Sequence, residues 1–139
     1  MIQLIVGEKG KGKTKIILDK ANETAASTEG NVVFVDKDNS HMYELKNNIR
    51  LIESMEYSIS NADEFAGFVA GIISADHDLQ QLFIDRLLKV ANIEEAQAEA
   101  LIRKIDALAT KYDVNCVVSV SVTKDQLPQD LQAKVISAL

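Results

Sequence analysis

The sequence predicts an α/β fold of three αβα layers, in which helices cover both faces of a mostly parallel sheet of about five strands. The first observation is that short apolar runs alternate along the chain with longer segments whose apolar residues recur at helical spacing. Such alternation is typical of parallel strands joined by crossover helices. The second observation is that these runs are mainly apolar, as expected for strands that are buried on both faces.

Three of the predicted strands are mainly apolar runs that stop at a glycine or a carboxylate. The first stops at a glycine, another stops at Asp36, and a later one stops at Asp85. A run that ends in this way indicates a buried strand. In chain order we expect strands at residues 2–6, 32–35, 82–84 and 115–122, with a short edge strand at 49–52.

Helical segments are expected between these strands. The first helix covers residues 13–27, and a short helix at 41–47 is capped by Asn39 or Ser40. Beyond residue 123 we expect a short helix and an edge strand.

Two longer helices have capping signals at their starts. Asn61 is followed three residues later by Glu64, and Asn92 is followed by Glu95, so each pair resembles a capping box. Apolar residues then recur at helical spacing and define one buried face on each helix. These faces carry Phe65, Phe68, Val69, Ile72 and Ile73 in the first helix, and Leu101, Ile105, Leu108 and Tyr112 in the second.

Length and composition indicate one compact unit. The chain has 139 residues, of which 47% are hydrophobic, so a core of ordinary size can form. We therefore expect residues 1–139 to be a single domain. The one cysteine, Cys116, lies among valines and is interpreted as a buried strand residue rather than a reactive thiol. A single cysteine provides neither an internal disulfide nor a metal-ligand pattern.

The charge and the apolar runs exclude some classes of partner. The formal net charge is −6, which argues against a protein that coats nucleic acid, because neutralising phosphates requires clustered Lys and Arg. No run of apolar residues is long enough for a transmembrane helix. The first residues also lack the features of a secretory signal, so a cytoplasmic location is expected.

One motif points directly to chemistry. Residues 7–14 read GEKGKGKT and match the phosphate-loop pattern G-x-x-x-x-G-K-[ST] between a predicted strand and a predicted helix. Glycines let the backbone direct successive N–H groups at phosphate oxygens, and the helix N-terminus adds free N–H groups and a positive dipole end. The predicted nucleotide-binding residues are Gly7, Glu8, Lys9, Gly10, Lys11, Gly12, Lys13, Thr14 and Lys15.

The motif gives a specific binding role to some residues of this loop and not to others. Lys13 is expected to contact the β- and γ-phosphates, and the Thr14 hydroxyl is expected to ligate Mg²⁺. For Lys9 and Lys11 the favoured interpretation is a pair of solvated side chains. For the whole segment, the alternative to a phosphate loop is a flexible turn rich in glycine and lysine.

A second magnesium ligand is expected at the end of another strand. In phosphate-loop proteins an aspartate at the end of an apolar strand holds Mg²⁺ opposite the loop. The run that ends at Asp85 has this form, so we expect Thr14 and Asp85 to share the metal. Asp36 has the same local form and competes for the role. The alternative for either residue is an ordinary aspartate at the end of a strand.

The order of these features resembles the RecA-like branch of P-loop ATPases. The shared order is a phosphate loop, a strand that ends in acids, a short helix, a short strand, an amphipathic helix and a strand that ends in aspartate, over about residues 1–122. The chain also resembles small stand-alone bacterial proteins described as ATP-binding. The resemblance implies that ATP and Mg²⁺ are the ligands.

The same resemblance implies further site residues. In that branch a carboxylate two residues beyond the end of the second strand activates the attacking water, and Asp38 stands at the matching position in place of the usual glutamate. The alternative for Asp38 is a helix cap or a solvated turn acid. A polar residue on the last strand often senses the γ-phosphate, and Ser119 or Ser121 matches that position. The catalytic assignments are therefore Asp38 and Lys13.

Three functions remain open from the sequence. The first is a MgATP-binding protein with weak hydrolysis, acting as a minimal ATPase or a nucleotide-gated switch. The second is a small-molecule kinase, for which Arg86 is the only arginine near the expected site. The third is a non-catalytic module that binds nucleotide and presents a surface to a protein partner or to a second copy. ATP is preferred over GTP because of the resemblance and because the chain has no N-K-x-D motif.

Overall fold

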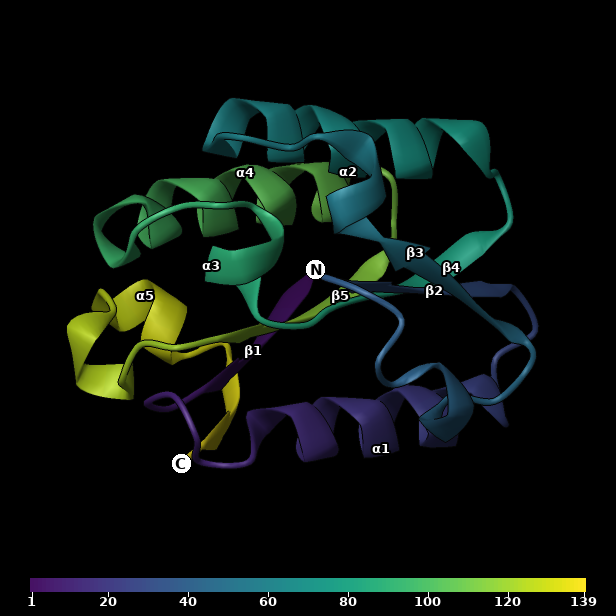
Figure 1. The fold of residues 1–139 in the computed structure, drawn as a ribbon. Helices are drawn as coiled ribbons and strands as arrows, with labels where there is room; N and C mark the ends of the chain where they lie inside the picture. Colours follow the sequence, from purple (N-terminus) through teal and green to yellow (C-terminus); the bar gives the residue numbers. More distant parts are fainter.

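The computed structural model describes residues 1–139 and contains one sheet of six parallel strands (Figure 1). The strands lie in the order β3-β2-β4-β5-β1-β6. The predicted three-layer α/β class is confirmed, and the sheet has one strand more than the expected five or so because the short edge strand near the end of the chain does form. The strands are β1 (Ile2–Val6), β2 (Asn31–Asp36), β3 (Ile49–Glu53), β4 (Leu79–Ile84), β5 (Asn115–Val120) and β6 (Val135–Ala138).

Five α-helices and four short 3₁₀ helices connect the strands. The α-helices are α1 (Lys13–Ala25), α2 (Ala62–Ala75), α3 (Leu87–Val90), α4 (Ala98–Lys111) and α5 (Gln129–Gln132). The 3₁₀ helices are η1 (Met42–Glu44), η2 (Ser54–Tyr57), η3 (Glu95–Gln97) and η4 (Lys124–Gln126). None of the helices is long and apolar enough to cross a lipid bilayer.

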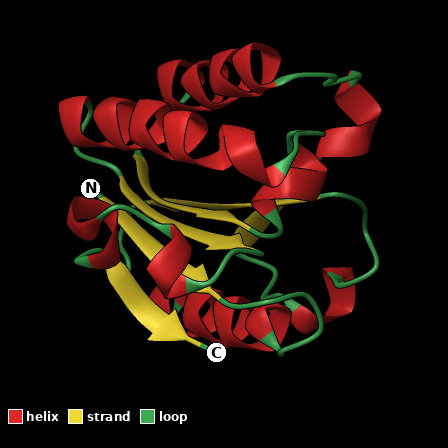
Figure 2. Ribbon diagram, turned by 90° about the vertical axis from the view of Figure 1, so that its left-hand side faces the viewer, coloured by secondary structure: helices red, strands yellow, loops and turns green.

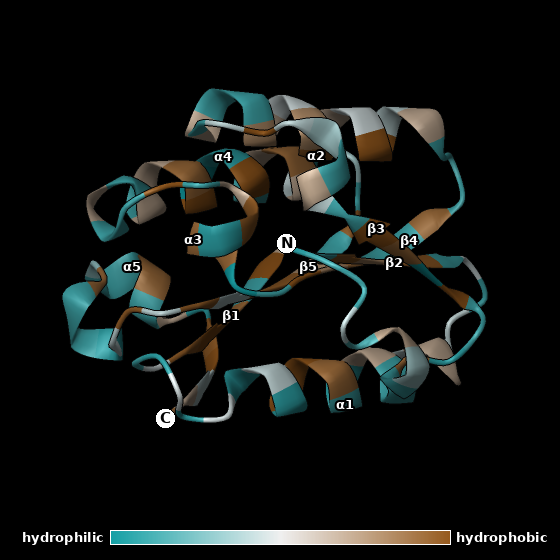
Figure 3. Ribbon diagram, in the orientation of Figure 1, coloured by the Kyte–Doolittle hydropathy of each residue, from teal (hydrophilic) through white to brown (hydrophobic).

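The helices cover the two faces of the sheet unequally. Helices α2, α3 and α4 lie on one face and α1 lies on the other, so the strands are enclosed between two helical layers (Figures 1 and 2). The face under α2, α3 and α4 carries a core of 28 buried residues, whereas the face under α1 carries a core of 10. The strands are correspondingly hydrophobic along most of their length (Figure 3). In the smaller core, fewer neighbouring side chains can move to fill the cavity that is left when a large side chain is removed.

The capping prediction is right for α2 and places the cap on the wrong residue before α4. The Asn61 side chain accepts a hydrogen bond of 2.9 Å from the Glu64 backbone N–H, as expected. Before α4, the capping box is formed instead by Glu94 and Gln97. Asn92 has a left-handed backbone with φ of 55° and belongs to the preceding turn. Polar residues that tolerate this conformation and residues that cap helices overlap in type, so the sequence pattern misassigned the start.

Two other local predictions need correction. The segment predicted as a helix at 41–47 forms only the 3₁₀ turn η1, since the backbone at Leu45 is already extended. Tyr112 was assigned to the buried face of the long helix, but it follows α4 as the C-cap and its side chain is exposed. Cys116 is buried in β5, as predicted.

The strand order brings three loops to one edge of the sheet. Strands β4, β5 and β1 are neighbours, so the segments that follow β1 and β4 emerge on either side of β5. The carboxyl edge of a parallel sheet is where α/β proteins place ligands. β2 is the other neighbour of β4, so Asp36 at the end of β2 lies close to Asp85. The backbone N–H of Asp85 donates to the carbonyl of Val35 at 3.0 Å.

Candidate functional site

The turn between β1 and α1 has the backbone that the motif requires. Gly10 and Gly12 have φ of 85° and 93°, a region that other residues adopt only with strain. Gly12 directly precedes α1, and no side chain caps the start of that helix. The first N–H groups of α1 are therefore available to an anion, and the positive end of the helix dipole favours one.

The lysine of the motif is folded back into the loop. Lys13 is 5% exposed, and its Nζ donates to the backbone carbonyl of Glu8 at 2.9 Å. Burial lowers the pKa of Lys13, while the negative charge of Asp85 acts in the opposite direction. The loop thus holds a largely desolvated cation, which interacts more strongly with an anionic ligand than an exposed lysine would.

Gly7 lies where β6 meets the loop. The backbone N–H of Leu139 donates to the carbonyl of Val6 at 2.9 Å, and a Cβ atom at Gly7 would lie 2.9 Å from the Leu139 carbonyl oxygen. A larger residue at Gly7 would therefore have to displace backbone. The last strand thus supports the start of the loop, a contact that the local sequence pattern did not show.

Asp85 and Thr14 lie side by side at the carboxyl edge of the sheet. The Thr14 hydroxyl donates to Asp85 Oδ2 at 2.9 Å, and the Ser119 hydroxyl donates to Asp85 Oδ1 at 2.5 Å. Asp85 is fully buried. Burial raises the pKa of Asp85, and the hydrogen bonds from Ser119 and Thr14 oppose that rise. The carboxylate that the sequence paired with Thr14 is therefore in direct contact with it.

Asp36, the competing aspartate, is committed to another partner. Its Oδ1 accepts a hydrogen bond of 2.8 Å from Arg86 Nη2, and its side chain is fully buried. Burial disfavours the charged form of Arg86, but the hydrogen bond and charge of Asp36 outweigh it and raise the pKa of Arg86. The nearby negative charge of Asp36 in turn helps to raise the pKa of Asp85.

A cavity of about 610 Å³ opens in front of these groups, and we call it the loop cavity. Four cationic side chains reach it, which stands out in a chain of net charge −6. They crowd one another: the charge of Lys9 is the main reason why the pKa of Lys89 is lowered. The lining residues are Lys9, Gly10, Gly12, Lys13, Thr14, Arg86, Leu88, Lys89, Ile93, Glu95 and Ser121.

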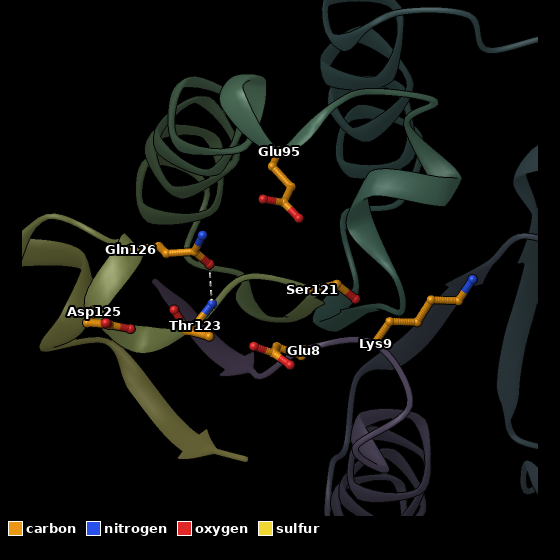
Figure 4. A pocket seen from close by; sticks show the side chains of 7 residues that line it. All are labelled: Glu8, Lys9, Glu95, Ser121, Thr123, Asp125 and Gln126. Atoms are coloured by element: carbon orange, nitrogen blue, oxygen red, sulfur yellow. Dashed lines mark hydrogen bonds between the residues drawn. The ribbon is translucent and has the colours of Figure 1, made fainter.

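A second cavity of about 650 Å³ adjoins the first and shares Lys9, Glu95 and Ser121 with it. We call it the side cavity, and Figure 4 shows its lining. Glu95 reaches in from one side and Glu8 from the other, while the Lys9 side chain extends away from Glu8. Every residue that lines this cavity is polar or charged: Glu8, Lys9, Glu95, Ser121, Thr123, Asp125 and Gln126.

The structure separates the other residues that the sequence singled out. Asp38 does not line the loop cavity; its carboxylate accepts a hydrogen bond of 3.0 Å from the Ser40 N–H. Hydrogen bonding to the side chain of Ser40 first, and to its backbone second, lowers the pKa of Asp38. Lys15 is exposed and pairs with Asp19 at 3.2 Å. Of the two serines, Ser119 is buried behind Asp85, whereas Ser121 lines both cavities.

Sequence reasoning did not assign Lys89 or Glu95 to the site, and it considered Arg86 only for a kinase. Lys89 lies on α3, a helix of one turn that carries no recognisable motif. Glu95 was interpreted as a capping residue, although it lines both cavities. The signal for Arg86 was its position directly after Asp85.

The residues at this edge fit a magnesium ion chemically. Mg²⁺ prefers oxygen ligands and commonly uses only one or two protein groups beside phosphates and water. The Thr14 hydroxyl and the Asp85 carboxylate are oxygen donors in contact with each other. No cluster of three or more His, Cys, Asp or Glu side chains forms a metal cage on its own. The arrangement therefore suits an ion that arrives with a phosphate ligand rather than a structural metal.

Comparisons with known proteins support the fold. No protein-family model matches the chain, and no curated protein matches it in sequence. Among solved structures, a KaiC-like protein from the hyperthermophilic archaeon Pyrococcus horikoshii matches with a TM-score of 0.63 and 16% identity. The match covers 95% of this chain but only 66% of that protein. The likeness supports the three-layer α/β fold that the sequence predicted.

Proposed function

We propose that residues 1–139 form one domain that binds ATP with Mg²⁺ and hydrolyses it weakly, as a minimal ATPase or a nucleotide-gated switch. The observation that carries this proposal is the loop cavity. Four cations, a glycine-rich turn and an uncapped helix start converge there, although the protein as a whole is acidic. A polyanion of the size of a nucleotide phosphate chain relieves the repulsion among these cations and occupies the free N–H groups.

Each residue has a defined part in the proposed complex. The loop amides and Lys13 hold the phosphates, which requires Lys13 to exchange the Glu8 carbonyl for a phosphate oxygen. Thr14 and Asp85 would hold the magnesium ion, which neutralises phosphate charge and supports binding. The side chain of Ser121 lies at the wall of the cavity and can donate to a phosphate oxygen.

The proposal predicts that Lys13→Ala removes most of the affinity for nucleotide. A charge-assisted phosphate contact contributes about 1.5–3 kcal/mol, so the loss should exceed about tenfold in dissociation constant. Calorimetric titration of MgATP and MgGTP into the wild type and the variant measures this directly. The wild type should prefer ATP.

The matched control is Lys46→Ala, which removes an exposed lysine outside both cavities. This variant should bind MgATP as the wild type does. Equal binding by the wild type and Lys13→Ala would show that the loop is not the nucleotide site. Absence of binding to the wild type would rule out the proposed function for the chain on its own.

The role proposed for Asp38 is to orient the attacking water. In this structure Asp38 is turned toward Ser40 and lies outside the loop cavity, so the segment after β2 must rearrange before hydrolysis. Contacts to a terminal phosphate commonly order such segments. Asp38→Asn should therefore lower turnover of MgATP and leave its affinity unchanged. Unchanged turnover in the variant would exclude this role, and absence of turnover in the wild type would favour a non-catalytic binding module.

A small-molecule kinase is a second candidate because the side cavity adjoins the loop cavity. Its carboxylates and hydroxyl groups could hold a polar acceptor next to the phosphates. Phosphorylated product in a screen of nucleosides and small acids with MgATP would favour the kinase. ATP consumption with release of phosphate alone would favour the ATPase.

A further inference from the structure

Arg86 leaves the end of β4 in an unusual backbone conformation. Its φ and ψ are 58° and 66°, the left-handed region that residues other than glycine rarely occupy. The backbone N–H of Arg86 donates to the Ser119 hydroxyl at 2.7 Å, and that hydroxyl is bonded in turn to Asp85. A conformation of this kind persists where neighbouring contacts impose it, and such residues cluster at ligand clamps and switches. Arg86 is therefore positioned by the same network that holds Asp85.

The ion pair between Arg86 and Asp36 is incomplete. Only one hydrogen bond joins the two side chains, from Nη2 to Oδ1. The second oxygen of Asp36 and the Nε of Arg86 are both buried without a hydrogen-bond partner. The Nε lies 3.6 Å from Asp85 Oδ2, which is too long for a hydrogen bond. An arginine paired in its preferred way makes two parallel bonds to a carboxylate, so this pair is held in a suboptimal arrangement.

Arg86 also lines the loop cavity. The Arg86 side chain is 27% exposed and lines this cavity together with Lys13 and Thr14. It approaches from the β4 side, and β5 separates β4 from the strand that carries the phosphate loop. A phosphate chain held by the loop amides would extend toward this side with its terminal group. Arginine binds phosphate with the same two-pronged geometry that it leaves unused on Asp36.

We propose that Arg86 discriminates nucleoside triphosphates from diphosphates by exchanging its bond to Asp36 for the terminal phosphate. The inference rests on the proposed function of the loop cavity and names the group that senses the length of the phosphate chain. Asp36 competes with that phosphate for one guanidinium. Its Oδ1 also accepts a hydrogen bond of 2.7 Å from the Lys37 N–H. Release of Arg86 therefore changes the contacts at the start of the segment that carries Asp38.

The test compares the affinities for MgATP and MgADP of the wild type and three variants. Arg86→Gln should weaken the affinity for MgATP by about tenfold or more, as loss of one charged phosphate contact does. Its affinity for MgADP should stay within about twofold of the wild-type value. Arg86→Lys keeps the positive charge but cannot donate two parallel hydrogen bonds to one phosphate. Its affinity for MgATP should therefore lie between those of Arg86→Gln and the wild type. Asp36→Asn removes the competing charge, so it should bind MgATP more tightly with MgADP unchanged.

The matched control is Arg50→Gln, which removes an exposed arginine on β3 and should change neither affinity. Equal losses of affinity for MgATP and MgADP in Arg86→Gln would overturn the inference, because Arg86 would then act as a positive charge that attracts both nucleotides or as a structural residue. If Arg86→Gln does not fold, the ratio of the two affinities in Arg86→Lys and Asp36→Asn decides, and an unchanged ratio in both overturns the inference.

Failure of the proposed function has a different signature from failure of this inference. If the wild type binds neither nucleotide, or binds without dependence on Lys13, the loop cavity is not the site and both proposals fall. If binding depends on Lys13 but the ratio of MgATP to MgADP affinity is the same with and without Arg86, only the role of Arg86 is excluded.

Discussion

Asp85→Asn should lose magnesium-dependent nucleotide binding and become more stable in the absence of nucleotide. The carboxylate is fully buried and contacts the Thr14 hydroxyl at 2.9 Å, so it is the acidic group closest to the proposed metal position. Loss of groups that support a bound metal weakens its binding by about 10–100-fold, and the upper end of this range is expected for a carboxylate. Titration of Mg²⁺ against a fixed concentration of nucleotide measures the effect.

The expected gain in stability follows from the pKa of Asp85. Burial raises that pKa above the usual 3.8, so the folded protein binds the proton more readily than the unfolded chain does. Stability of the wild type therefore falls as pH rises from about the unfolded value through the raised folded value. The variant has no carboxyl group at position 85 and should lack this contribution to the pH dependence. Thermal unfolding of both proteins across the acidic range to neutral pH checks the sign.

A control variant separates these effects from a general loss of negative charge. Glu29→Gln removes an exposed carboxylate that lines neither cavity. It should leave both the magnesium dependence and the pH profile as in the wild type. If nucleotide binding by Asp85→Asn depended on magnesium as in the wild type, Asp85 would be excluded as a magnesium ligand.

Phe83→Ala should destabilise the protein by about 3–5 kcal/mol, the usual cost of deleting a buried aromatic side chain. Phe83 is fully buried on β4 and stacks on Phe34 of β2, with ring centroids 6.3 Å apart. Both rings belong to the smaller core of 10 residues under α1, which has few side chains that could fill the cavity. Urea unfolding of the wild type and the variant measures the difference in free energy.

Phe83→Leu is the matched variant, because leucine keeps most of the apolar contact and loses the aromatic stack. We expect it to cost about 1–2 kcal/mol, well below the alanine variant. Equal destabilisation by the two substitutions would mean that the ring shape rather than the buried volume determines the stability of this face.

Most of the fold could be predicted from local pattern, with errors where residue types serve two purposes. The parallel strands were recognisable because burial on both faces requires continuous apolar runs, and Asn61 was recognisable as a cap. The start of α4 was misassigned because Asn92, a typical capping residue, instead occupies a left-handed turn. Tyr112 kept the helical spacing but lies one residue beyond the helix, where its side chain is exposed.

Predictions for the site were strongest where neighbours in the sequence are also neighbours in space. The predicted phosphate loop is such a case, since its glycines, Lys13 and Thr14 lie within one turn and one helix start. The magnesium pair was inferred from two separate segments, and the structure places these two side chains in contact. The assignments of Lys13, Thr14, Asp85 and Asp38 to nucleotide chemistry remain predictions.

The sequence by itself determined the layered α/β class, the glycine-rich turn before α1 and the apolar strands that end in acids, because these depend on local periodicity and backbone requirements. Only the tertiary structure decided which acid meets which partner. Thr14 and Asp85 are 71 positions apart, and Arg86 and Asp36 are 50 apart. Two aspartates that each end an apolar strand therefore differ in their partners, because strand order places Asp85 against the turn that carries Thr14 and leaves Asp36 to Arg86.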